Sequence, residues 1–308
     1  MKSTRFITEG AVLLALYSIM LLLITYVPFL SIVLTYLMPL PFIIFSLKYS
    51  IKESLLLICV ALGLTLVITQ TSFILGTFMF STVGIAIGYQ LGKERSKGEI
   101  LLTSTFLYFI HIVLIYLIVQ LMFDINISNS VTTRMNELLE TSKNLYSDLG
   151  VSYNEKNVKS ITELLKLLPV LVPSIMLMLG FTMAFLTQLL TFPIVRRLSF
   201  KTPKFKPFRE FRLPLGFMWL YLIITILSYF GSKPNGFFYT AIMNISYVLH
   251  ILVITQGFAA IFYFSHIRKL SKAVPILILI AGLLINGLMI FVLLIGIISI
   301  GIFNRMKK

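Results

Sequence analysis

The dominant feature of this sequence is a repeating alternation between long apolar runs and short polar breaks. Each run is long enough for a helix to cross a hydrocarbon core of about 30 Å, and the two-residue alternation typical of strands is absent. We therefore predict an all-α fold, a polytopic transmembrane helical bundle. The predicted spans are residues 10–28, 31–47, 53–70, 72–91, 100–123, 167–194, 214–230 and 237–264, followed by an apolar run at 274–303.

The last apolar run is too long for one simple crossing. As a single helix it would measure about 45 Å, and Asn286 and Gly287 lie near its middle. Three arrangements fit: one tilted helix, a kinked helix with an interfacial tail, or a re-entrant hairpin that returns Arg305 and the following lysines to the cytoplasmic side. The charge pattern favours the return, while the short halves argue against two full crossings.

Two hydrophilic segments interrupt the spans. Residues 124–166 are expected on the outer side, as an amphipathic helix that lies on the membrane or caps a cavity, or as a plain surface connector. Residues 196–213 form a basic loop whose phenylalanines would lie among anionic headgroups. The apolar positions of the outer segment are Val131, Met135, Leu138, Leu139, Leu145 and Leu149, and the rings of the loop are Phe200, Phe205, Phe208 and Phe211.

Composition and charge agree with a membrane protein and indicate its orientation. The chain is 58% hydrophobic and 12% charged, with a net charge of +15 and a mean hydropathy of +0.98. Lysine and arginine concentrate in alternate loops, so the positive-inside rule places the amino terminus in the cytoplasm and the chain in the cell membrane. Nucleic-acid binding is not favoured, because these cations flank spans instead of forming one folded face.

Motifs for covalent or metal chemistry are absent from the sequence. There is no GxxxxGK[ST], HExxH, CxxC or GxSxG, and the centres of the first eight spans carry no charged residue. Cys59 is the only cysteine, which excludes an intrachain disulfide, and we expect it to pack in a core. We therefore predict that the protein is not an enzyme and uses no cofactor or metal.

Two histidines lie near the middle of predicted spans. His111 has Tyr108 three residues before it, and His250 has Tyr247 and Asn244 at helical spacing. If the two helices touch, the imidazoles could share a proton or a ligand. The alternative is that each is a neutral, hydrogen-bonded packing residue.

Uncharged polar residues gather toward the outer half of several spans. Buried amides and hydroxyls need partners, so these residues either bond one another across helices or line a pocket open to the outside. The residues of this candidate solute pocket are Gln70, Thr71, Thr77, Tyr116, Gln120 and Ser174.

Small residues form a stripe at the start of the first span, in the stretch EGAVLLALYS. Side chains this small gain nothing in lipid, whereas they let another helix approach closely. The candidate docking residues for a partner helix are Gly10, Ala11, Ala15 and Ser18, and the alternative is that another helix of this chain fills the groove.

These features resemble two families. The first six spans resemble the S component of energy-coupling-factor transporters through the AxxxA of Ala11 and Ala15, the short second to fourth spans, and the proline-bearing span before a basic turn, LMPLPFIIFSLKYSIKE. The whole chain, from the opening TRFITEGAVLLAL onward, is similar to the YybS family of predicted bacterial membrane proteins (DUF2232). The long outer loop and the spans after residue 195 depart from S components.

The resemblance implies a domain plan and a function. Residues 1–195 would be a six-helix S-component-like core that includes the outer segment, 196–213 a cytoplasmic loop, and 214–308 two or three further helices. The protein would bind a small solute such as a vitamin from the outer side and dock a transmembrane coupling protein on Ala11 and Ala15. A non-transporting scaffold that recruits membrane proteins is the alternative, and an intramembrane enzyme using His111 or His250 is the third.

Overall fold

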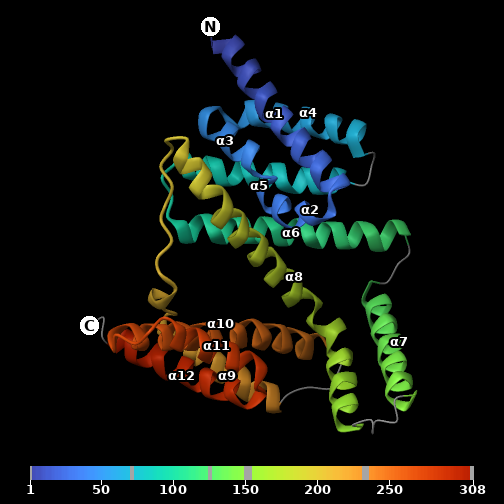
Figure 1. The fold of residues 1–308 in the computed structure, drawn as a ribbon, viewed down its shortest axis with the longest axis vertical. Coiled ribbons are helices and arrows are strands. Elements are labelled where there is room, and N and C mark those ends of the chain that lie inside the picture. Colours follow the sequence, from blue (N-terminus) through green and yellow to red (C-terminus); the bar gives the residue numbers. More distant parts are fainter. Residues whose placement is uncertain (1, 70–72, 124–126, 149–154, 231–235, 306–308) are drawn as a thin grey trace. The chain divides into compact units, whose positions relative to one another are not determined.

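The computed structural model of the chain describes residues 2–69, 73–123, 127–148, 155–230 and 236–305 (Figure 1). These residues form helices and no strand, which confirms the predicted all-α class. Within them, eight helices are long and apolar enough to cross a membrane. The elements are α1 (Lys2–Tyr26), α2 (Pro28–Leu37), α3 (Leu40–Lys48), α4 (Ile51–Thr69), α5 (Ile74–Gly92), α6 (Lys97–Phe123), α7 (Ile127–Asp148), α8 (Glu155–Arg197), η1 (Phe208–Glu210), α9 (Leu215–Phe230), α10 (Phe237–Ile267), α11 (Ala273–Leu284) and α12 (Asn286–Arg305).

The chain divides into two units, each with its own apolar core. Unit 1 comprises Met1–Ile125 and Met176–Lys204, and unit 2 comprises Asn126–Ile175 and Phe205–Lys308. The predicted plan placed residues 1–195 in one domain, whereas unit 2 takes Asn126–Ile175, which covers most of the outer segment and the first part of the sixth predicted span. The predicted loop 196–213 is also divided, because unit 1 ends at Lys204. In the structure α8 contributes to both units, and the first part of this helix is hydrogen-bonded to α10 within unit 2.

The second predicted span is two helices instead of one. Pro39 and Pro41 have no N–H to continue the hydrogen-bond ladder of α2, so that helix ends and α3 begins with a proline in its first turn. Residues Leu40 to Phe45 of α3 are all buried, whereas α2 contains no buried residue. The break therefore separates an exposed half-span from a half-span at the centre of unit 1.

Two glycines bring α3 and α5 together in unit 1. A Cβ placed on Gly84 would lie 2.6 Å from the carbonyl oxygen of Pro39, and one on Gly88 would lie 2.5 Å from that of Ile43. Real Cβ atoms essentially never approach so closely. Because lipid supplies no hydrophobic force between helices, this backbone approach and its dispersion contacts hold the pair.

The single cysteine corrects a sequence expectation. Cys59 is exposed, although we expected it in a core. The buried face of α4 is made by Leu57, Ile58, Ala61 and Thr65, which recur at helical spacing. Residue 59 lies outside that stripe and faces away from the core.

In unit 2, α10 and α12 cross closely at a reciprocal pair of glycines. A Cβ on Gly257 would collide with the carbonyl oxygen of Val292, and one on Gly296 with that of Val253. Farther along both helices, Phe264 stacks near Phe303, with ring centroids 6.1 Å apart. The contacts advance in the same direction along the two helices, so α10 and α12 run parallel.

The last apolar run is a hairpin. The chain leaves the helical conformation at Ile285, which ends α11 and precedes α12. Since α12 runs parallel to α10, α11 must lead the chain back, and its 12 residues reach only about 18 Å. Of the three arrangements, the structure has the hairpin, in which the ends of α10 and α12 lie at the same end of unit 2. The return of Arg305 to the cytoplasmic side stays a prediction.

The end of α12 lies beside the start of α9. The Asn304 side-chain amide donates to the carbonyl oxygen of Leu213 at 3.1 Å, and Leu213 N–H donates to the Gln256 side chain at 2.8 Å. The Arg212 guanidinium lies 4.5 Å from the centre of the Phe303 ring. These contacts fix one end of unit 2, which carries Arg212 and Arg268 and is called the basic end of unit 2 below.

The two hydrophilic segments differ in their content of helix. The outer segment contains α7, on which Leu138 and Leu145 are exposed, and the start of α8. An amphipathic helix on the membrane surface stays a prediction for this segment. The basic loop is non-helical apart from η1, and Phe208 packs edge-on against Phe262, with centroids 5.5 Å apart. Part of this loop is therefore held by the protein itself instead of lying free among headgroups.

Candidate functional site

The small residues at the start of α1 point in different directions. Gly10 is buried against Phe45 and Leu57, and Ser18 is half-buried, whereas Ala11 and Ala15 are exposed. The four predicted docking residues therefore do not form one surface. Ala11 and Ala15 lie on the outward face of the helix, and Gly10 serves packing within unit 1.

The opposite face of α1 explains this arrangement. Tyr17 and Leu21 are almost completely buried in the core of unit 1, at 0% and 1% exposure. Val12 and Ile19 are exposed on the other side, at 63% and 56%. The outward face is thus wholly apolar, with two alanines set between larger side chains, and no described residue of unit 1 covers it.

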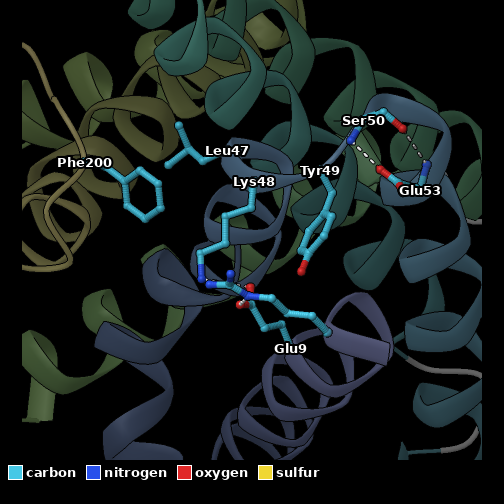
Figure 2. A pocket seen from close by; sticks show the side chains of 8 residues that line it. Glu9, Leu47, Lys48, Tyr49, Ser50, Glu53 and Phe200 are labelled. Carbon is cyan, nitrogen blue, oxygen red and sulfur yellow. Dashed lines mark hydrogen bonds and ion pairs between the residues drawn. The ribbon is translucent and has the colours of Figure 1, made fainter. Parts of the chain in front are cut away.

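A charged cavity lies at the first turns of the same helix (Figure 2). Its volume is about 610 Å³, and its walls come from the start of α1, the junction of α3 with α4, and the loop after α8. Figure 2 shows Lys48 and Tyr49 reaching toward Glu9, with Leu47 and Phe200 on another side. The lining residues are Arg5, Glu9, Leu47, Lys48, Tyr49, Ser50, Glu53 and Phe200.

The charges in this cavity pair with one another. Glu9 accepts from Arg5 Nε at 2.9 Å and from Lys48 Nζ at 2.8 Å, which joins α1 to the end of α3. Burial and the Glu9 carboxylate raise the pKa of Tyr49. Glu9 is therefore held as a doubly paired anion, and it is not placed as a general base.

The remaining carboxylate of the cavity caps a helix. Ser50 N–H donates to Glu53 at 2.7 Å, and Glu53 N–H donates to the Ser50 hydroxyl at 3.4 Å, which is a capping box at the start of α4. Ser96 and Glu99 repeat the pattern at the start of α6. Within the described residues, no group of His, Cys, Asp or Glu is arranged to hold a metal ion.

The candidate solute-pocket residues are dispersed. Gln70 and Thr71 lie outside the described residues, and Tyr116 and Gln120 are half-buried on α6 in unit 1. Ser174 belongs to unit 2, where it bonds Asn244. The structure therefore does not gather the six residues into one described site.

Thr77 is part of a buried cluster of three hydroxyls from α1, α4 and α5. Its Oγ1 lies 2.6 Å from the Tyr17 hydroxyl and 2.8 Å from Thr65, and Tyr17 lies 3.2 Å from Thr65. All three side chains are buried. This cluster fastens three helices of unit 1 to one another, which is the structural alternative to a solute contact.

The two mid-span histidines bond residues other than their predicted neighbours. His111 Nδ1 lies 2.7 Å from the carbonyl oxygen of Leu107 and Nε2 lies 3.1 Å from the Thr82 hydroxyl, so both ring nitrogens have partners. A carbonyl only accepts, so Nδ1 is assigned the proton. Tyr108, three residues earlier on the same helix, bonds the Thr187 hydroxyl of α8 at 3.0 Å and not the imidazole.

His250 belongs to unit 2, whereas His111 belongs to unit 1. Its Nδ1 lies 3.2 Å from the Tyr221 hydroxyl of α9, and its imidazole does not bond Tyr247 or Asn244. Each histidine thus has a local partner within its own unit, as expected of a hydrogen-bonded packing residue.

Asn244 forms a clamp that sequence reasoning did not identify. Its Oδ1 accepts from Ser174 N–H at 2.8 Å, and its Nδ2 donates to the carbonyl oxygen of Val170 at 2.7 Å and to that of Thr240 at 2.7 Å. Ser174 N–H and Val170 C=O are the two groups that bond each other in an ordinary helix. The clamp therefore attaches α10 directly to the backbone of α8.

The prolines of α8 were the available signal for this clamp. Pro169 and Pro173 each remove one N–H from the ladder of the helix, which weakens it over this turn. The carbonyl oxygens left without a helical donor are those of Leu165 and Pro169, and the second of them directly precedes a carbonyl that Asn244 bonds. A helix weakened over one turn gives a polar side chain on another helix access to its backbone.

Comparison with known proteins agrees with the resemblance of the whole chain to the YybS family. Residues 15–299 match the family described as predicted membrane protein (DUF2232). The chain is also 30% identical over 283 residues to the protein named Uncharacterized protein YybS of Bacillus subtilis (strain 168), covering 92% of this chain and 91% of that protein. No solved structure matches the chain. The chain is therefore a multi-pass membrane protein that belongs to the YybS (DUF2232) family.

Proposed function

We propose that the protein is a membrane subunit of the S-component type, which docks a partner membrane protein on α1 and takes up a small solute from the outer side. The observation that carries this proposal is the exposure of Ala11 and Ala15 on a helix whose opposite face is buried. Two small residues one turn apart, flanked by the larger Val12 and Ile19, would let a partner backbone approach α1 closely and gain dispersion contacts. We call this surface the α1 groove.

The charged cavity lies at the start of the same helix. It adjoins the first turns of α1, and its ion pair of Glu9 with Lys48 holds α1 against the end of α3. An exposed or half-exposed pair contributes at most about 1 kcal/mol. In the proposal the ion pair holds the first turns of α1 in a fixed direction relative to α3 and supplies no binding energy for the partner.

A non-transporting scaffold is the second candidate, and the paired hydroxyls favour it. Tyr17, Thr65 and Thr77 satisfy one another, and Tyr108 bonds Thr187, so these groups offer little to a solute. A scaffold would use the same α1 face for its partner. The two candidates differ in whether a small molecule accompanies the protein, and neither assigns catalysis to His111 or His250.

Docking on α1 is tested by filling the groove. We expect the double variant Ala11→Leu, Ala15→Leu to lose a stoichiometric membrane-protein partner after cross-linking in native membranes and mild solubilisation, because leucine blocks the backbone approach. The matched control is Gly63→Leu on α4, where a new Cβ meets no atom within 4 Å. Quantitative mass spectrometry of the purified complexes measures the partner.

The same samples separate the candidates. A small molecule retained by the wild type in native mass spectrometry supports the solute-binding subunit, and a bundle that is always empty supports the scaffold. Both fail if the double variant keeps its partner at wild-type stoichiometry. They also fail if it aggregates while Gly63→Leu remains monodisperse, since the groove would then be filled within the chain.

The proposed orientation has the amino terminus and the carboxyl-terminal end of α12 in the cytoplasm. Single cysteines in a Cys59→Ser background test it with a membrane-impermeant maleimide on intact cells. We expect Phe237→Cys, at the opposite end of α10 from Arg268, to be labelled from outside, and Arg305→Cys to be labelled only after lysis. Labelling of Arg305→Cys in intact cells would refute the inward return of the hairpin.

A further inference from the structure

An apolar groove runs along α10 and α12 near the basic end of unit 2. Its volume is about 410 Å³, and its floor includes the buried Ser265 and Ser299. The walls are mostly branched or aromatic and face outward: Phe264 is 42% exposed, Ile298 60% and Ile302 42%. The lining residues that matter here are Ile261, Phe264, Ile295, Ile298 and Ile302, with Arg268 at the mouth.

Arg268 is the cation that lines the groove, and Lys269 and Lys272 follow it in the chain before α11. Arg268 directly follows α10, Lys269 adopts a left-handed conformation with φ 54°, and Lys272 precedes α11. Arg268 takes part in none of the ion pairs formed by the described residues. Arg212, at the same end of unit 2, is instead stacked on Tyr263 and Phe303.

We propose that this groove binds one anionic phospholipid, with an acyl chain along α10 and α12 and the phosphate on the Arg268 guanidinium. The charge order matches such a ligand, because the apolar walls lie within the span and the cations lie just beyond its end. Basic pockets between transmembrane helices recognise anionic headgroups in this way. Guanidinium also suits phosphate geometry better than ammonium does.

Other occupants fit less well. A free phosphate would leave the apolar walls without a ligand, and a zwitterionic lipid would bring its own ammonium toward the cationic mouth. A helix of a second copy of this chain would place apolar side chains in the groove, yet it would leave Arg268 without a counter-charge. The lipid alone satisfies both halves of the groove.

Lipid titration of the delipidated full-length protein, followed by native mass spectrometry, tests the proposal. The probes are phosphatidylglycerol and phosphatidylethanolamine with identical palmitoyl and oleoyl chains, and inorganic phosphate as competitor. We expect tighter binding of phosphatidylglycerol, and about fivefold weaker binding of that lipid by Arg268→Gln. Lys206→Gln, which removes an exposed cation outside the groove, should bind as the wild type does.

A second pair of variants tests the apolar half independently of charge. Ile298→Trp should fill the groove and lower the occupancy of both lipids, whereas Ile226→Trp, on an exposed position of α9, should not. Equal affinity of Arg268→Gln and wild type for phosphatidylglycerol would overturn the proposal. So would full displacement of the lipid by inorganic phosphate, or a dimer whose formation excludes lipid.

Discussion

Replacing Gly84 or Gly88 by alanine is expected to remove most of the folded protein. Each new methyl group would meet a carbonyl oxygen of α3, of Pro39 for Gly84 and of Ile43 for Gly88, and a backbone atom cannot rotate away. The two helices would have to separate, which would leave voids beside the buried residues of α3. We expect a loss of about 3 kcal/mol for each variant, at the upper end of the cost of overpacking.

The matched control is Gly63→Ala on α4, where a new Cβ meets no atom within 4 Å. Alanine favours the helix over glycine, so this variant should be unchanged or up to about 1 kcal/mol more stable. Apparent melting temperature and the monodisperse fraction after solubilisation are the measurements. If Gly84→Ala and Gly63→Ala behave alike, α3 and α5 do not meet through their backbones.

The contact between α3 and α5 shows which features the periodicity of the sequence could predict and which it could not. Span positions were predictable, because the length of an apolar run is a local property. The small-residue motif that joins helices was sought at the start of the first span, where Ala11 and Ala15 turned out to be exposed. The G-x-x-x-G of Gly84 and Gly88 has the same spacing, but nothing local in the sequence says which stripe faces a neighbour.

The division into two units could not be read from composition. Residues 167–194 form a single apolar run, and one continuous helix was the correct prediction for them. The packing boundary nevertheless falls inside α8, after Ile175. Before this boundary, α8 packs on α10 through Asn244, which lies 70 positions beyond Ser174 in the sequence. A pairing over such a distance leaves no local pattern.

The candidate site was predictable by residue type but not by partner. Polar residues in spans were expected to find hydrogen bonds, and Thr77, His111 and Ser174 do so. Their partners lie on other helices. Which residues become partners depends on how the helices pack, and the local sequence does not encode this. The charged cavity was missed because Glu9 and Lys48 belong to different helices. The two Ser-x-x-Glu caps were within reach, since their spacing is local.

The second large effect is expected from Asn244→Leu, which keeps the branching at Cγ and removes the clamp on α8. Ser174 N–H, the Ser174 hydroxyl and Val170 C=O all lose their partner on α10. Interhelical hydrogen bonds in membranes contribute about 0.6 kcal/mol on average and at most about 1.7 kcal/mol. We expect a loss of about 2–3 kcal/mol in unfolding free energy, measured in detergent titrations.

Two further variants show whether the clamp, and not polarity as such, carries this effect. Thr255→Val on the same helix removes a hydroxyl whose one hydrogen bond is to Ile251 O, four residues back, so it should cost less than about 0.5 kcal/mol. Asn244→Asp retains the shape but turns a donor into an acceptor facing the Val170 and Thr240 carbonyl oxygens, so it should be at least as damaging as leucine.

Hydrogen exchange distinguishes a local clamp from general loosening of unit 2. In Asn244→Leu the amides around Ser174 should exchange faster than in the wild type, because two prolines have already thinned the ladder of α8 on this turn. Amides near Gly257 and Gly296, where α10 and α12 cross, should change little. Equal acceleration at both places would mean that Asn244 supports the whole unit, and unchanged exchange at Ser174 would mean that α8 holds this turn without it.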